Sequence, residues 1–368
     1  MHRNRDTVRW LVVLLAGSAI SCRSIGPPTV ARDRIDYLTA IGNSWKQQTL
    51  LNIVKLRYGD MPVFLEVTQL IAGYQVQSTV SAGIVGGNPP SSNGLIGPFT
   101  VTGSAGTIDT YTDRPTVMYA PLMGVDFLKK LMTPIPPSAV LFLLQAGYSA
   151  ELVLPIAVDS INGLANESKR GMQRPADPRF LRLAKLMRDG QLSGGLQIRI
   201  EHPATGAETS VIVFGPTRDP KMAEAGREIR GLLGVRPGLQ RLDVYYGGYS
   251  GKDDEIDMTT RSMLQVMLEL AAGSVEVPAS DVAEGRAAPG LVTDGAPGAA
   301  DASTIPIQSG PEAPKDAYVA VRYGGRSFWI ADTDVQAKLR FTFVMLLFSI
   351  SDTGVRGNAP VVTVPASP

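Results

Sequence analysis

Apolar residues in the first part of the chain recur with the spacing of a helix. Between residues 33 and 58, side chains such as Ile35, Leu38 and Trp45 return every three or four positions. This period predicts an amphipathic helix. A Gly-Asp pair and then Pro62 follow it, and these residues predict its end.

The pattern then changes to a period of two over residues 74–112. In the segment 74–85 the residues Tyr74, Val76 and Val80 share one parity, whereas Gln75 and Gln77 belong to the other. Turn-forming residues follow in "GGNPPSSNG", and the alternation resumes in "PFTVTGSAGTIDTYT". Such alternation is typical of strands. We therefore expect a long β-hairpin rich in Gly, Ser and Thr.

Helical spacing returns after the hairpin. The pattern predicts helices at 123–132, 138–147, 150–162 and 178–189. Residues 33–192 are therefore expected to form a helical region around the hairpin 74–112.

The C-terminal part, 193–368, predicts hairpin–helix–strand modules. "LQIRIE" and "ETSVIVF" flank a turn, and a helix at about 219–233 and the strand "QRLDVYY" follow. The same order recurs over 318–365, where "YVAVRY" and "SFWIA" flank "GGR" and Thr333 opens a helix. Together with the first half, this predicts an α+β fold.

A segment of different composition lies between the two modules. Residues 275–317 are rich in Ala, Pro, Gly and Asp and contain no aromatic residue. Such a segment buries little apolar surface, so we expect a disordered insertion. A linker between two domains is the alternative.

The first 21 residues have the organisation of a secretory signal peptide. Three arginines precede the apolar run "LVVLLAGSAI", which is too short to span a bilayer. Ser21 and Cys22 follow, and Cys22 is the only cysteine of the chain. A cut after Ala19 is the rival interpretation, but it leaves one unpaired cysteine in an oxidising compartment. A buried N-terminal helix is a further alternative.

The residues Ala19-Ile20-Ser21-Cys22 resemble the signal of bacterial lipoprotein precursors. Ala19 departs from the Leu that is usual at this position. The resemblance covers residues 1–22 and implies that Cys22 carries a diacylglyceryl group and a third acyl chain such as palmitate, which anchor the chain stably. Arg23, in place of Asp, implies sorting to the outer membrane. Residues 22–32 would then be a lipidated tether.

Charge and composition narrow the function further. The formal net charge of +1 gives no electrostatic footprint for nucleic acid. The 368 residues are 44% hydrophobic, enough for one large or two modest domains. No motif predicts a metal site or a cofactor.

Candidate chemistry is sparse. His202 is the only histidine after His2, and it lies at a predicted turn without a nucleophile motif. The acidic stretch 251–260 lacks the spacing of a calcium loop, so we expect its acids to cap a helix that begins at Asp257. The nearby "YYGGYSGKDD" fails as a phosphate-binding loop.

These observations predict a lipid-anchored outer-membrane protein that faces the periplasm. We expect a non-catalytic scaffold or accessory subunit of an envelope complex, with an unidentified protein partner. The alternative is an oligomeric pore or export channel, because each arm of the 74–112 hairpin exceeds the roughly 9–11 residues of a membrane strand. One hairpin cannot close a ring, so this function requires a homo-oligomer. An ordinary sheet edge or packed hairpin is the simpler interpretation, and an envelope hydrolase is the third function.

Overall fold

The computed structural model describes residues 27–365 apart from 72–73, 88–99, 114–115, 170–172, 202–208, 216–218, 289–303 and 352–361. The chain divides into two compact units. The first contains residues up to 42, 66–120 and those from 360 onward; the second contains 43–65 and 121–359. These units do not correspond to the expected regions 33–192 and 193–368.

The α+β fold is confirmed, and most of its strand pairs are antiparallel. The elements of the first part of the chain are α2 (Pro27–Arg57), β1 (Phe64–Ile71), β2 (Tyr74–Gly87), β3 (Thr100–Asp113), β4 (Thr116–Leu122), α3 (Val125–Met132), α4 (Pro137–Gln145), α5 (Ala150–Ala157), β5 (Val158–Ile161), β6 (Leu164–Ala165) and α6 (Pro178–Ser193).

The elements that follow are β7 (Leu196–Glu201), β8 (Thr209–Phe214), α7 (Pro220–Leu233), β9 (Arg241–Tyr246), β10 (Glu255–Thr260), α8 (Met263–Ser274), α9 (Ala279–Ala283), β11 (Gln308–Gly310), β12 (Val319–Tyr323), β13 (Arg326–Ile330), α10 (Val335–Ser351) and β14 (Val362–Pro365). Helix α2 begins ahead of the expected position 33, so residues 27–32 of the expected tether are helical.

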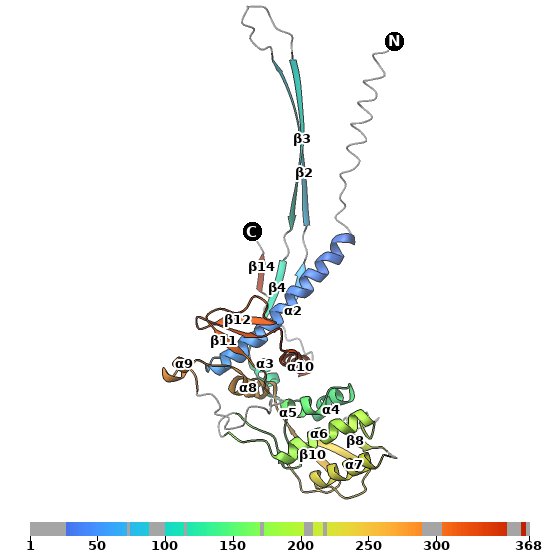
Figure 1. Cartoon of the computed structure of the whole chain (residues 1–368). Helices are drawn as coiled ribbons and strands as arrows, with labels where there is room; N and C mark the ends of the chain where they lie inside the picture. The colour runs from blue at the N-terminus through green and yellow to red at the C-terminus, as the bar shows by residue number, and fades with distance from the viewer. Residues whose placement is uncertain are drawn as a thin grey trace, which may run out of the picture. The chain divides into compact units, whose positions relative to one another are not determined.

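The predicted hairpin is present in the first unit as the two-stranded ribbon β2–β3 (Figure 1). Fourteen residues of each strand pair from Tyr74↔Asp113 to Gly87↔Thr100 without a register shift. Among the described residues no third strand joins this ribbon. Within the described part of the chain, the hairpin is therefore a sheet of its own rather than the edge of a larger one. A separate sheet has the order β1-β4-β14.

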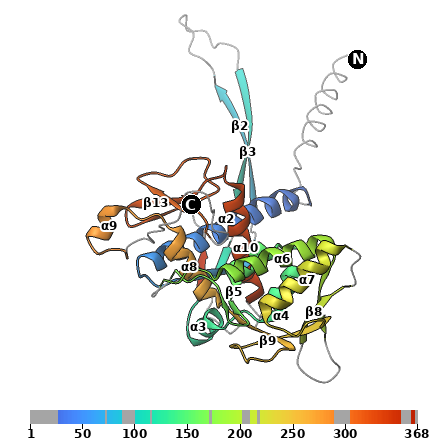
Figure 2. The same cartoon turned by 60° about the horizontal axis from the view of Figure 1, so that its bottom comes forward.

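The second unit is built on a six-stranded sheet with the order β6-β5-β10-β9-β8-β7. Helix α4 contacts four of these strands, β7 to β10, and α6 packs between α5 and α7. Figure 2 shows α4, α6 and α7 grouped beside β8 and β9. The sheet takes β5 and β6 from the first half of the sequence and β7 to β10 from the second.

One hydrophobic core runs through the second unit. Its members include Leu50 and Ile53 of α2, Phe64, and Phe343 of α10, each at most 1% exposed. Phe64 and Phe348 approach to 4.8 Å between ring centroids. Burial of aromatic and branched side chains in this continuous core is the main stabilising contribution to the fold.

The start of β1 is fixed to α2 by polar contacts within this core. The Asn52 amide donates to the Val63 carbonyl at 2.8 Å and accepts from the Val63 N–H at 2.9 Å. Gln48 Oε1 accepts from the Leu65 N–H at 2.7 Å. Because Asn52 is 1% exposed, its two contacts compete little with water. They hold the chain where β1 begins.

Two predicted helices have different boundaries in the structure. The helix expected over 150–162 ends at Ala157, because Asn162 and Gly163 form the two-residue turn of the β5–β6 hairpin with φ angles of 44° and 78°. The helix expected from Asp257 is also wrong. Residues 255–260 form β10, and α8 starts after Ser262, which makes a capping box with Gln265.

The two predicted modules do not pair alike. Strand β9 pairs with β8 of the first module, whereas β14 pairs with β4 in another sheet. The expected disorder over 275–317 is wrong for both ends of the segment. Residues 275–288 contain α9, and β11 pairs with β13. Ile305 and Ile307, at most 1% exposed, belong to the core.

The β5–β6 turn gives a test of this fold. The buried Asn162 amide donates to the Leu233 carbonyl at 2.8 Å and accepts from the Asp257 N–H at 2.7 Å. Asn162→Gly keeps a residue that adopts positive φ but removes both contacts. We expect the free energy of unfolding to fall by about 2 kcal/mol, measured by urea denaturation. A change in the free energy of unfolding no larger than the error of the measurement would show that the Asn162 amide does not hold the turn.

Candidate functional site

The residue predicted to carry the lipid, Cys22, lies outside the described residues, as does His202. Their predicted roles stay predictions. Within the described part of the chain no group of three or more His, Cys, Asp or Glu side chains could hold a metal ion. In the same residues no helix combines the length and the apolar character needed to cross a bilayer.

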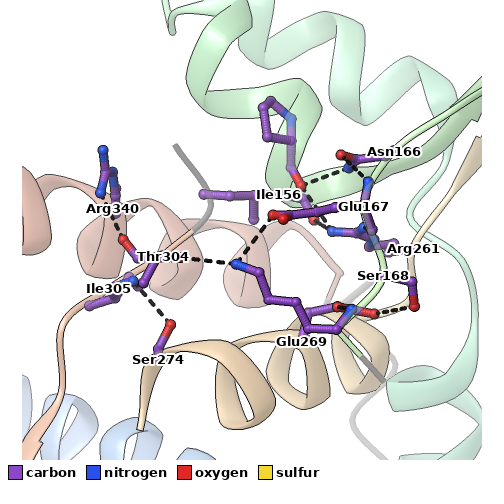
Figure 3. A network of polar contacts seen from close by, with 12 residues as sticks. Ile156, Asn166, Glu167, Ser168, Arg261, Glu269, Ser274, Thr304, Ile305 and Arg340 are labelled. Carbon is purple, nitrogen blue, oxygen red and sulfur yellow. Dashed lines mark hydrogen bonds and ion pairs between the residues drawn. The ribbon is translucent and has the colours of Figure 1, made fainter. Parts of the chain in front are cut away.

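The most concentrated set of charged and polar groups is a buried network in the second unit (Figure 3). Arg261 lies at its centre, between β10 and the capping box of α8, and is 2% exposed. Its guanidinium donates to the carbonyls of Pro155 at 2.9 Å, Ile156 at 3.4 Å and Glu167. The first two belong to the last turn of α5, where the helix dipole favours a cation.

Asn166 lies beside Arg261 and orders the chain after β6. Its side-chain N–H groups donate to the carbonyls of Pro155 at 2.9 Å and Val158 at 2.7 Å. Its side-chain oxygen accepts from the Glu167 N–H at 2.8 Å. Asn166 and Arg261 thus share the Pro155 carbonyl, and together they satisfy the C-terminal end of α5.

Charged side chains of opposite sign continue the network toward α8. Lys169 forms an ion pair with Glu167 at 3.2 Å, and its backbone N–H donates to Glu269 Oε2 at 2.6 Å. The lysine stem lies on Gly273 so closely that a Cβ there would be 2.3 Å from Lys169 Cδ. Gly273 therefore provides the space in which the lysine reaches the interior.

The far end of the network ties down the chain that follows the undescribed segment 289–303. The Lys169 ammonium donates to Thr304 Oγ1 at 2.9 Å, and Arg340 of α10 donates to the Thr304 carbonyl at 2.7 Å. Ser274 Oγ accepts from the Ile305 N–H at 3.0 Å. Figure 3 shows these residues converging from α8, α10 and the irregular segment that carries Thr304 and Ile305.

The chemistry of this network is structural. Its carboxylates accept from backbone and side-chain donors at close range, and none of its residues lines either of the two cavities described below. A general acid or base needs access to a bound substrate. The arrangement instead compensates buried charges that would be costly alone.

The larger cavity, about 480 Å³, is lined by Tyr58, Asp281, Arg286, Tyr323 and Gly324. The Tyr58 hydroxyl donates to Asp281 Oδ2 at 2.7 Å, and the Tyr323 hydroxyl donates to Asp60 at 3.0 Å. The two tyrosine rings lie 5.3 Å apart between centroids. This is a polar, aromatic hollow with one carboxylate among its lining residues.

Ionisation of the two phenols is suppressed at this cavity. Burial, followed by the hydrogen bond and charge of Asp281, raises the pKa of Tyr58 to about 12, although Arg326 and Arg57 oppose this rise. Burial and the hydrogen bond to Asp60 raise the pKa of Tyr323. Both groups are therefore hydrogen-bond donors near neutral pH, and neither is a nucleophile or general base.

The smaller cavity, about 260 Å³, lies between α7 and the β7–β8 pair and is formed largely by glycine and alanine. Arg230 lies 4.0 Å above the Phe214 ring centroid and donates to the Leu239 carbonyl at 2.6 Å. Burial lowers the pKa of Arg230. This arginine serves to pack α7 against β8.

Comparison with protein-family models, curated proteins and solved structures finds no match for this chain.

The sequence pattern did not indicate the buried network. Arg261 lies beside the true capping box, and Asn166 to Lys169 follow a two-residue turn. A charged residue between a strand and a helix cap is a weak signal, because most such residues are solvated. Its burial depends on chain segments more than 90 residues apart, since Arg261 contacts Glu167 with a separation of 94.

Replacing Arg261 tests the structural role of the network. Arg261→Met leaves the carbonyls of Pro155, Ile156 and Glu167 without this donor, so we expect a loss of about 3 kcal/mol or more in unfolding free energy. Arg261→Lys keeps the positive charge but not the several donors of the planar guanidinium, so its loss of unfolding free energy should be smaller. Arg199→Met, on an exposed part of β7, is the control and should change stability by less than about 0.5 kcal/mol. Equal losses in R261M and R199M would contradict this role.

The raised pKa of Tyr58 predicts a pH dependence. Because the pKa is about 12 in the folded chain against 10.0 ordinarily, the fold favours the protonated phenol. Its stabilisation is fully present below pH 10 and is lost as pH rises through 12. Urea midpoints measured between pH 9 and 12 should fall less steeply in Tyr58→Phe. Unchanged steepness would exclude Tyr58 as the group responsible.

Proposed function

We propose that the protein is a non-catalytic, lipid-anchored component of the bacterial outer membrane that faces the periplasm. It acts as a scaffold or accessory subunit of an envelope complex. The sequence pattern that ends at Cys22 supports the anchor. The enclosed network around Arg261 and the protonated phenols at the larger cavity favour a structural role over catalysis.

The observation that carries this proposal is the unaccompanied ribbon β2–β3. Both of its outer edges have backbone donors and acceptors to which no described strand pairs. A two-stranded ribbon is marginally stable by itself in water, and an open strand edge is a template for another strand. A ribbon of this length is therefore an element for assembly, and this suits a scaffold.

A second candidate function is an oligomeric outer-membrane pore or export channel. The length of the ribbon, with 14 residues in each strand, favours it. A third function, envelope hydrolysis by paired carboxylates, receives less support, because Asp281 is the only acid among the residues that line the larger cavity.

The anchor is tested by replacing the lipid-bearing residue. We expect the full-length chain expressed with its own N-terminus to partition into the detergent phase, because at least two acyl chains give stable membrane binding. Cys22→Ser should move the chain to the aqueous phase, whereas the neighbouring Ser24→Ala should partition like the unchanged chain. Partition is measured by phase separation and immunoblotting.

Retention of Cys22→Ser in the detergent phase would overturn the lipid anchor. The scaffold is tested separately by purification of the full-length chain in mild detergent. A stoichiometric second protein in the particle supports it. A particle that contains only this chain, even after cross-linking in intact cells, counts against it.

A further inference from the structure

The pairing register places the mainly apolar alternate residues of β2 and those of β3 on the same face of the ribbon. Even-numbered residues of β2 pair with odd-numbered residues of β3, as in Val76↔Tyr111 and Ala82↔Ala105. The opposite face carries mostly polar or small residues, as in Gln77↔Thr110, with Val85 and Ile108 as its apolar members. A slip of one residue would mix the two sets. The register therefore converts two alternating sequences into one amphipathic ribbon.

The longest run of apolar or small residues on this face of β2 lies in the part of the ribbon near its turn. Ser78 pairs with Asp109 on the apolar face, toward the β1–β4 end. From Val80 to Gly86 this face carries apolar or small residues on β2, opposite Thr107 to Val101 of β3. Seven residues at about 3.3 Å each give this stretch a length of about 23 Å. This length is close to the roughly 25 Å apolar band of membrane β-barrels.

The two outer edges are complementary to each other. One edge belongs to β2 and the other to β3, and the two strands are equal in length and opposite in direction. If the β2 edge of one copy meets the β3 edge of the next, every neighbour is antiparallel. Two copies joined in this way still have one free β2 edge and one free β3 edge. Further copies can therefore add by the same contact, head to tail, until a ring closes. A foreign strand would cover one edge and leave the other open.

We infer that the hairpins of several copies of this chain pair edge to edge, β2 against β3, and close into a ring that spans the outer membrane. The apolar face contacts lipid, and the face with Gln77 and Thr110 lines an aqueous passage. Closure satisfies the backbone groups that would otherwise meet hydrocarbon unpaired. This inference rests on the second candidate function, the pore, and identifies its partner as a second copy.

Cysteine cross-linking between two tagged copies tests the pairing. Ser81→Cys in β2 is coexpressed in turn with Thr102→Cys, Ser104→Cys and Thr110→Cys in β3; all four positions share the polar face. Directly opposed residues on neighbouring strands fall within the Cα distances of a disulfide. We expect at least one mixed pair to shift to twice the monomer mass. S81C with S81C should stay monomeric, as should the unchanged chain with its Cys22.

Pore formation is measured separately. Detergent-extracted full-length chain is added to phosphatidylcholine–phosphatidylglycerol vesicles that contain a fluorescent dye. Dye release is expected, and deletion of residues 74–112 should abolish it. The urea midpoint of the deletion variant shows whether the second unit, which has its own core, is still folded.

The two experiments distinguish failure of the pore from failure of the edge-to-edge pairing. Mixed cross-links with dye release support the inference. Mixed cross-links without release overturn the pore but keep the ring as part of a scaffold. Cross-links between two S81C chains overturn the head-to-tail order. A single-copy mass by light scattering, with no mixed cross-link at any position, overturns the pairing itself.

Discussion

A single buried cation organises the second unit. Arg261 can be only 2% exposed because three carbonyls from two separate segments accept its protons. An uncompensated charge in this position would be prohibitive, so the chain around 155–169 has to fold against β10 and α8. Lys169 and Thr304 extend the same network to the C-terminal end of the long Ala-, Pro- and Gly-rich segment.

The two units differ in how their stability is provided. The second unit has a continuous apolar core, and its buried charges are compensated internally. The ribbon β2–β3 has hydrogen bonds between its own strands, while its outer edges pair with no described strand. The contacts of Asn52 and Gln48 hold the start of β1 to the core. The chain thus joins the second unit, which has its own core, to the ribbon β2–β3, whose outer edges need another molecule to complete their backbone hydrogen bonds.

Elements with strong periodicity could be predicted from the sequence. The hairpin, the β7–β8 pair and the helix α7 follow directly from alternation or helical spacing, because these patterns are local. The apolar residues before Asn162-Gly163 continue the helical pattern past the point where α5 ends. The helix cap lies at Ser262 and Gln265, after β10, rather than at Asp257. Ile305 and Ile307 are core residues within a segment of low hydrophobicity, so composition averaged over the segment concealed them. The network around Arg261 could not be predicted, since its partners are distant in sequence.

The absence of a bulge in the β2–β3 register restricts how the length of the ribbon can change. Inserting one residue into either arm would move every residue beyond it to the opposite face. Lengthening that preserves both faces requires two residues at a time, added to both arms together. The same arithmetic applies to deletions. Variation in the length of this hairpin is therefore expected in steps of four residues.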